Sequence, residues 1–194
     1  MILEIAKYGQ PVLRKKGERI ERITPEIKKL IADMFETMAE NHGVGLAAQQ
    51  VGVAKQLTVL DVRAITDRPS TLELDGQPAD PAEIMPLVLI NPEITPVGDP
   101  VAGPEGCLSF PEIFAEISRP GTVDVQALDA KGKPITFRCG GLLARAVQHE
   151  KDHLNGVLFI DRMDKKTKTE LQPELDALQA KTKAALQKGP ESSK

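Results

Sequence analysis

The apolar positions between residues 24 and 43 predict an amphipathic helix near the start of the chain. Apolar side chains recur three or four positions apart, which places them on one face of a helix. Thr24 is a favoured N-cap residue and Pro25 a favoured first helical residue, and we expect the helix to end near Asn41–Gly43. The apolar face, which we expect to join the core, consists of Ile27, Leu30, Ile31, Met34, Phe35 and Met38.

Short apolar runs rich in β-branched residues predict strands further along the chain. Two such runs are LTVLDV at 57–62 and LVLIN at 87–91. The segment 66–86 between them is rich in Pro, Asp and Gly, which predicts a long surface loop. The segments 122–129 and 135–139 flank the turn residues DAKGKP, and this arrangement predicts a hairpin.

The last third of the chain is predicted to be mainly helical. GLLARAVQHEKDHLNG at 141–156 has an apolar side and ends in Asn-Gly, a typical helix stop. The tail from Asp164 is rich in Ala, Leu, Lys and Gln, and we expect a helix that is interrupted at Pro173 and frays at GPESSK. Since helices and strands do not alternate regularly, we predict an α+β fold. Antiparallel sheets would pack around the helix at 141–156, with an N-terminal and a C-terminal helix beside them.

Length and composition are those of an ordinary globular protein. The chain has 194 residues, of which 41% are hydrophobic and 27% charged, and its formal net charge is -3. We expect residues 1–165 to form one domain and residues 166–194 a helical tail. The weak net charge and the aromatic content of 3% argue against DNA or a membrane as a partner.

The first residues and the two cysteines bear on the cellular compartment. MILEIAKYGQ lacks the apolar run and cleavage site of a secretion signal, and no stretch approaches the roughly 20 apolar residues that span a bilayer. We therefore expect a cytoplasmic protein in which Cys107 and Cys139 are reduced thiols. A reduced cysteine is available as a metal ligand.

The segment from His149 to His153 has the spacing of a helical metal site. Residues four positions apart lie on one face of a helix, so the two imidazoles can bind one ion. Glu150 is then placed to act as general base on a water at that ion. Two surface histidines in a charged helix would give the same pattern without a metal. We favour the metal site because two of the three histidines of the chain stand in this frame.

The third ligand of a catalytic metal site must come from elsewhere in the chain, because such sites use about three protein ligands and one open position. Cys107, in the segment EGCLS, is the best candidate, and a thiolate with two imidazoles suits zinc or ferrous iron. Three alternatives stay open: a closed Cys2His2 site that includes Cys139, a disulfide between the two cysteines, or two buried thiols. Structural zinc cysteines usually come in closely spaced pairs, and a closed site gives Glu150 no role.

The glycine-rich segment GVGLAAQQ at 43–50 is a further candidate for function. It does not fit a dinucleotide-binding loop, because it follows a helix and lacks the third glycine. Two interpretations fit: a helix C-cap followed by a tight turn, or a backbone that approaches a substrate closely with a side-chain amide aimed into the site. The residues alone leave both open.

Together, GVGLAAQQ, EGCLS and QHEKDH resemble in order and separation the three motifs of the peptide deformylases. The resemblance extends over roughly residues 3–165. It implies a metal-dependent hydrolase that removes the formyl group from the N-terminal formyl-methionine of nascent proteins and releases formate. Water at the metal would attack the formyl carbonyl, with Glu150 as general acid and base.

The resemblance also implies roles for individual residues. Cys107, His149 and His153 would be the metal ligands, and the metal would be ferrous iron, for which zinc, nickel or cobalt can substitute. The side-chain amide of Gln50 and the backbone N–H of Leu108 would bind the oxyanion. The substrate-binding residues would be Val44, Gly45, Glu105 and Gly106.

The resemblance further implies two partners, N-formylmethionyl nascent peptides and the ribosome, which the tail of relatives contacts. The simpler interpretation of the tail is a solvated helix face, which we favour. The lysines concerned are Lys165, Lys166, Lys168, Lys181, Lys183 and Lys188.

Two other functions are compatible with the same histidine helix. A metalloprotease would use it on internal peptide bonds, but this leaves EGCLS and GVGLAAQQ unexplained. A non-enzymatic binding module would use the metal for stability alone, with a closed four-ligand site that includes Cys139.

Overall fold

The computed structural model describes residues 1–189, and its strands form two sheets. The strands are β1 Gly45–Ala47, β2 Leu57–Leu60, β3 Ser70–Leu74, β4 Gln77–Ala79, β5 Leu87–Pro96, β6 Pro100–Cys107, β7 Phe110–Pro120, β8 Thr122–Leu128 and β9 Pro134–Gly140. Seven of them form one sheet in the order β1-β2-β5-β8-β9-β3-β4, and β6 pairs with β7 in a separate hairpin. All of these pairings are antiparallel.

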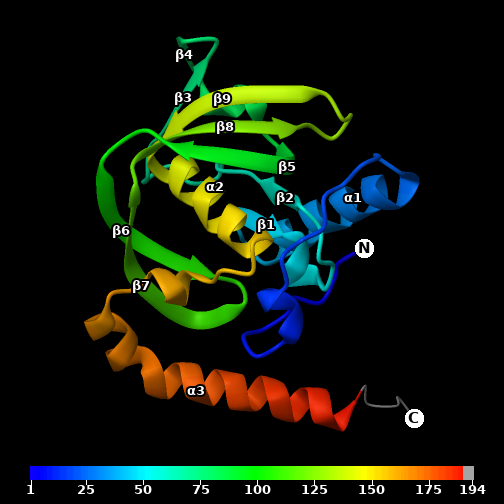
Figure 1. The fold of residues 1–194 in the computed structure, drawn as a ribbon, viewed down its shortest axis with the longest axis vertical. Helices are drawn as coiled ribbons and strands as arrows, with labels where there is room; N and C mark the ends of the chain where they lie inside the picture. Colours follow the sequence, from blue (N-terminus) through cyan, green and yellow to red (C-terminus); the bar gives the residue numbers. More distant parts are fainter. Residues whose placement is uncertain (190–194) are drawn as a thin grey trace.

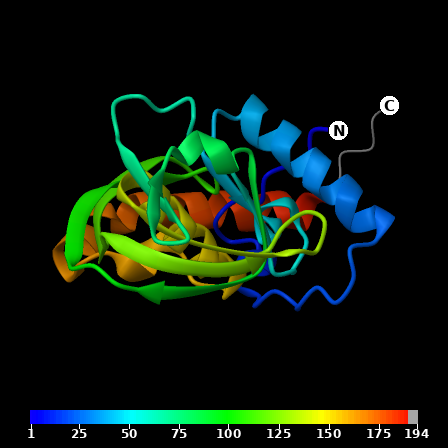
Figure 2. The same cartoon turned by 90° about the horizontal axis from the view of Figure 1, so that it is seen from above.

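The helices pack around and between the two sheets. The α-helices are α1 Pro25–Glu40, α2 Gly141–Leu154 and α3 Lys165–Lys188, and the short 3-10 helices are η1 Pro11–Arg14, η2 Ala48–Val51, η3 Pro81–Ile84 and η4 Phe159–Arg162. Figure 1 shows α2 in the centre, between the seven-stranded sheet and the hairpin of β6 and β7, with α3 along the outside. In the turned view α1 lies on the outer side of the molecule, where it packs against β1 and β2 (Figure 2). The predicted α+β arrangement around a central helix is confirmed.

The strand β5 shows why the large sheet is buried on both faces. Leu87 and Leu89 belong to the core cluster that includes α2, whereas Val88 and Ile90 belong to the cluster that includes α1. Successive residues of a strand point to opposite faces, so a continuous apolar run fills both cores. This packing fixes the position of α2 against the sheet.

Most of the elements predicted from apolar periodicity are confirmed. The Thr24 side chain accepts a hydrogen bond from the Ile27 N–H at 3.3 Å, and α1 begins at Pro25. The hairpin of β8 and β9 and the helix α2 agree with the predictions to within two residues. The strands β2 and β5 also form, although β5 continues to Pro96, well beyond the apolar run.

The segment 66–86 is not the surface loop that its composition predicts. It contains β3, β4 and η3, and β3 pairs with β9 to extend the sheet. Leu72 on β3 is buried in the core. Asp75 and Gly76 form the turn between β3 and β4 with φ values of 50° and 74°, and positive φ at both positions is what a two-residue hairpin turn requires. Asp-Gly is thus a hairpin signal that the surrounding polar composition masks.

The helix α3 is continuous, and the predicted interruption at Pro173 is wrong. A proline inside a helix removes a hydrogen bond and costs about 3 kcal/mol. Leu171, Leu175 and Leu178 lie on both sides of Pro173 and pack against one core cluster, which keeps the two halves in line. Residues 190–194, part of the end predicted to fray, lie outside the described residues. Within residues 1–189 no helix combines the length and apolar character needed to cross a bilayer.

An ion pair joins the N-terminal segment to η4. Arg14 donates to both carboxylate oxygens of Asp161, at 2.6 and 3.2 Å, and the Leu158 N–H donates to the same carboxylate at 2.9 Å. Burial alone would raise the pKa of Asp161, but the hydrogen bonds from Arg14 and Leu158 outweigh it, and the pKa lies below its usual value of 3.8.

Replacement of this carboxylate should therefore have a pH-dependent effect on stability. We expect Asp161→Asn to lower the free energy of unfolding by about 1 kcal/mol near neutral pH, since the pair is partly exposed and screened by solvent. Because the pKa is lower in the folded protein, this stabilisation is present above the unfolded pKa and is lost as the pH falls through the folded pKa. Urea unfolding between about pH 7 and about pH 3 measures the difference, with the exposed Asp67→Asn as control. If the difference in unfolding free energy between the wild type and Asp161→Asn stayed constant from about pH 7 to about pH 3, this would contradict the role of the ion pair.

Candidate metal centre

Three side chains with metal-ligand atoms converge between α2 and the end of β6. His149 and His153 lie one turn apart on α2, and Cys107 is the last residue of β6. Their ligand atoms all lie within 4.8 Å of one another, and Cys107 Sγ is 3.3 Å from His153 Nε2. The predicted set of one thiol and two imidazoles is therefore brought together by the fold.

The geometry of this cluster fits a single cation. A sulfur and a nitrogen that bind one tetrahedral ion at about 2.3 and 2.1 Å lie roughly 3.6 Å apart. The observed 3.3 Å between Cys107 Sγ and His153 Nε2 is close to this separation. Both imidazoles are buried, and burial is the main effect that lowers the pKa of His153 well below its usual value. His153 is therefore held as the neutral imidazole, the form that binds metals.

Glu105 fixes the orientation of the first histidine. Its Oε1 lies 2.9 Å from His149 Nδ1. Burial alone would raise the pKa of Glu105, but the hydrogen bonds and charges of His149 and Arg119 lower it to about 2. A carboxylate that stays ionised can only accept, so Nδ1 carries the proton and Nε2 is left facing Cys107 and His153. This is the usual way in which a metal-binding histidine is oriented.

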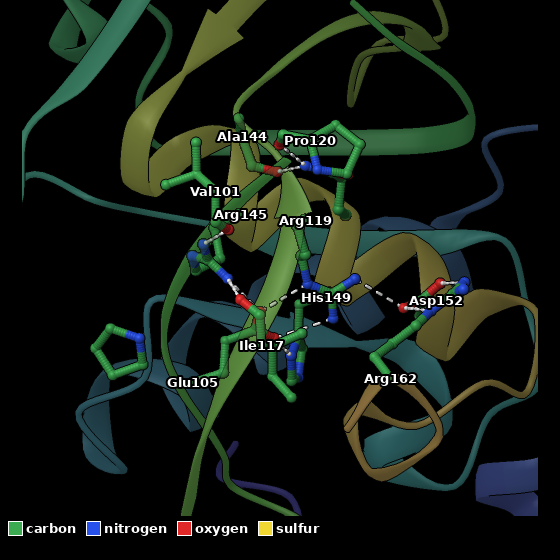
Figure 3. A network of polar contacts seen from close by, with 12 residues as sticks. Val101, Glu105, Ile117, Arg119, Pro120, Ala144, Arg145, His149, Asp152 and Arg162 are labelled. Carbon is green, nitrogen blue, oxygen red and sulfur yellow. Dashed lines mark hydrogen bonds and ion pairs between the residues drawn. The ribbon is translucent and has the colours of Figure 1, made fainter. Parts of the chain in front are cut away.

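Arginines surround Glu105 in a buried network (Figure 3). Arg119 donates to both oxygens of Glu105, at 2.7 and 3.0 Å, and Arg145 donates to Oε2 at 2.9 Å. Arg119 also binds Asp152 at 2.9 Å, and Asp152 accepts from Arg162 near the surface. The network thus joins β6, β7, α2 and η4 around the carboxylate that holds His149.

Glu150 lies beside the ligands with one oxygen uncommitted. Its Oε2 is buried and has no hydrogen-bond partner among the described residues. Burial raises the pKa of Glu150 to about 7, although the charge of His149 acts in the opposite direction. A carboxyl group that titrates near neutrality can both take up and give back a proton.

The segment 43–50 approaches Glu150 very closely. A Cβ atom on Gly45 would lie 2.6 Å from Glu150 Oε1, so only glycine leaves this carboxylate in place. Farther along the segment, Gln50 Oε1 accepts from the Ala47 N–H at 3.0 Å, which directs Nε2 toward Ser109 Oγ at 3.2 Å and Cys107 Sγ at 3.5 Å. The side-chain amide therefore faces the metal cluster.

A cleft of about 500 Å³ opens over the cluster and collects most of the predicted site residues. His153 does not line it and is buried. The predicted residues that line the cleft are Val44, Gly45, Gln50, Glu105, Gly106, Cys107, Leu108, His149 and Glu150.

The second cysteine lies away from this cluster, which decides between the alternatives left open by the sequence. Cys139 is on β9, opposite Leu72 and Val123, and is buried in the core shared with α2. Burial raises the pKa of its thiol to about 12. Both cysteines are free thiols, so neither a disulfide nor a closed site that includes Cys139 exists.

Several residues of the site were not predicted from the sequence. Lys7 and Arg68 line the cleft, and Arg119 and Arg145 hold Glu105. Lys7, Arg68 and Arg119 come from separate segments outside the three motifs, and Arg145 lies one turn before His149 on α2. Buried arginine on a strand is the signal that could have pointed to Arg119, because such a charge requires a partner.

Comparison with known proteins bears on the identity of the chain. A model of the polypeptide deformylase family matches residues 2–169. The peptide deformylase of Opitutus terrae is 46% identical over 192 residues, which cover 98% of this chain and 100% of that protein. The chain belongs to the polypeptide deformylase family. As a member, it is a metal-dependent hydrolase that removes the formyl group from the N-terminal formyl-methionine of nascent proteins.

Other members of the family agree with this assignment. The peptide deformylase of Methylacidiphilum infernorum is 44% identical over 178 residues, which cover 92% of this chain and 93% of that protein. The crystal structure of peptide deformylase 1B of Arabidopsis thaliana in complex with an inhibitor has a TM-score of 0.81 and 38% identity, with 94% of this chain and 93% of that chain covered. The deformylase fold is therefore shared over nearly the whole chain.

The close approach of Gly45 to Glu150 leads to a prediction. In Gly45→Ala the new methyl group must displace the Glu150 carboxylate, and a shift of about 1 Å at a reacting group can lower the rate about 10²-fold. We expect kcat for formate release to fall by about this factor, with metal content and the free energy of unfolding close to wild type. Turnover at the wild-type rate in Gly45→Ala would show that the position of Glu150 is not critical.

Proposed function

We propose that Cys107, His149 and His153 are the metal ligands of this deformylase and that Glu150 is its general acid and base. The convergence of the three ligand atoms within 4.8 Å carries this proposal. The uncommitted Oε2 of Glu150 supports it, because a buried carboxylate oxygen without a protein partner is available to a water or a substrate. We propose ferrous iron as the metal: one thiolate and two imidazoles suit iron or zinc, and the resemblance to the deformylases favours iron of the two.

The proposed mechanism assigns the proton transfers to one carboxylate. When bound, the cation supplies a Lewis acid that lowers the pKa of water toward neutrality. Glu150 takes the proton of the attacking water at its free Oε2 and later gives it to the nitrogen of the leaving methionyl amine. The amide of Gln50 and the N–H of Leu108 donate to the oxygen that becomes negative, which typically contributes about 10²–10³ in rate for each donor.

The substrate would enter along the free edge of β1. Nothing pairs with the outer edge of β1 within the described sheet, in which β1 is the terminal strand. Val44 and Gly45 line the cleft there, and a peptide can bind such an edge by strand addition. The carboxylate of Glu105 is engaged by His149, Arg119 and Arg145, so we propose that Glu105 and Gly106 meet the substrate through their backbone.

Formate release from formyl-Met-Ala-Ser tests this function. We expect the anaerobically purified protein to release formate from this peptide and to leave a blocked internal peptide intact. A metalloprotease would instead cleave the internal peptide. Glu150→Gln should retain the metal and lose at least about 10²-fold in kcat, because it removes the proton acceptor. Normal turnover in Glu150→Gln, with metal bound, would remove Glu150 from the mechanism.

For the tail we propose a separate role. Residues 1–165 would form the catalytic domain and 166–194 a helical tail whose lysines contact ribosomal RNA, which would place the enzyme with nascent chains in the cytoplasm. Exposed lysines on α3, among them Lys165 and Lys166, support this proposal, since phosphate contacts come mainly from such side chains.

Co-sedimentation with ribosomes tests the tail. The full chain should bind ribosomes at low salt and dissociate as salt rises, because phosphate contacts release counterions. Replacing Lys165, Lys166 and Lys168 by glutamine should weaken binding and leave formate release from a free peptide unchanged. Equal binding of this variant and the wild-type chain would exclude these lysines from the contact.

A further inference from the structure

The segment Ala6–Tyr8 joins two of the three motif segments that line the cleft. The Ala6 N–H donates to the Gln50 carbonyl at 2.7 Å, and the Tyr8 N–H donates to the Ser109 carbonyl at 2.9 Å. The Tyr8 ring also stacks on Phe110, with ring centroids 4.8 Å apart. The N-terminal segment therefore holds the glycine-rich segment and the β6–β7 turn in a fixed relation.

Between these two anchors, Lys7 reaches into the cleft. Its Nζ donates to the Leu108 carbonyl at 2.9 Å, and the side chain lines the cleft. Within the described residues no carboxylate lies within ion-pair distance of this ammonium group. Burial is the main effect on Lys7 and lowers its pKa, whereas the nearby Cys107 acts to raise it.

The carbonyl that Lys7 binds belongs to a two-residue turn. Cys107 pairs with Phe110 at the end of the hairpin, which leaves Leu108 and Ser109 as the turn. Both turn carbonyls are held from the N-terminal segment, that of Leu108 by Lys7 and that of Ser109 by Tyr8. The N–H and the carbonyl of Leu108 lie in the two peptide planes on either side of one Cα. The two-residue turn restricts the φ and ψ angles between these planes, so holding the carbonyl also restricts the N–H.

We propose that Lys7 is a positioning residue for catalysis, which sets the direction of the Leu108 N–H and adds a positive charge to the wall of the cleft. This inference rests on the proposed role of that N–H as an oxyanion donor. Loss of one oxyanion donor typically costs about 10²–10³ in rate, and a misaligned donor loses part of that contribution. Lys7 would therefore act mainly on the transition state, in which the negative charge on oxygen is larger than in the substrate.

Three variants test the proposal. Lys7→Met removes the charge and the donor, and Lys7→Arg keeps both. Lys151→Met is a matched control, because Lys151 is also partly buried, also donates to a backbone carbonyl (that of Pro92) and lies outside the cleft lining. All variants are loaded with the same metal, and their metal content is measured. The values of kcat and KM come from formate release from formyl-Met-Ala-Ser. Amide hydrogen exchange of residues 107–110 reports on the order of the turn.

We expect kcat of Lys7→Met to fall about 10- to 100-fold with KM within about threefold of wild type, since an interaction made in the transition state changes kcat. Lys7→Arg should recover most of the loss, and hydrogen exchange of the turn should rise in Lys7→Met alone. Lys151→Met should retain kcat.

Three results would overturn the proposal: wild-type kcat in Lys7→Met, a change confined to KM, or an equal loss of kcat in Lys151→Met. Failure of the proposed function is distinguishable, because the wild-type enzyme itself would then release no formate.

Discussion

The contact between the end of β6 and one face of α2 is the constraint on which the active site depends. The helix offers two imidazoles one turn apart, and the hairpin offers one thiol. Neither element can hold a catalytic cation alone, since such a site needs about three protein ligands. The distance of 3.3 Å between Cys107 Sγ and His153 Nε2 therefore depends on how the hairpin sits against the helix.

Buried charges hold the hairpin in that position. Glu105 on β6 accepts from Arg119 on β7 and from Arg145 and His149 on α2. Buried ion pairs add little net stability, because removing two charges from water costs about as much as their attraction returns. Removing one partner, however, leaves a buried charge without compensation, so alternative placements of the hairpin are disfavoured. We interpret the network as a device that fixes geometry, with the two packed faces of the large sheet supplying the stability.

The parts of the fold that follow from local periodicity were predictable from the sequence. Three features depend only on residues that are close in the chain. They are the apolar face of α1, the apolar residues of β5 and the four-residue spacing of His149 and His153. The Asp75–Gly76 turn was overlooked because the polar composition around it is also typical of loops. The continuity of α3 through Pro173 depends on packing against distant residues, which no local pattern records.

The residues of the candidate site also fall into those that a local motif predicts and those that only the fold brings to the site. The three motifs were visible as short segments, and the fold brings them to one cleft. The role of Cys139 could not be decided from the sequence, because its separation from Cys107 in space depends on β9 facing the core. Lys7 and Arg119 reach the site through tertiary structure alone, and Arg145, although it lies one turn before His149 on α2, contacts Glu105 of another motif segment.

X-ray absorption of the zinc-loaded enzyme tests the central claim most directly. We predict one sulfur neighbour at about 2.3 Å and at least two nitrogen neighbours at about 2.0–2.1 Å around a single ion. The sulfur signal should disappear in Cys107→Ala and persist unchanged in Cys139→Ala. Two sulfur neighbours in the wild-type enzyme, or a sulfur neighbour that survives in Cys107→Ala, would contradict the proposed centre.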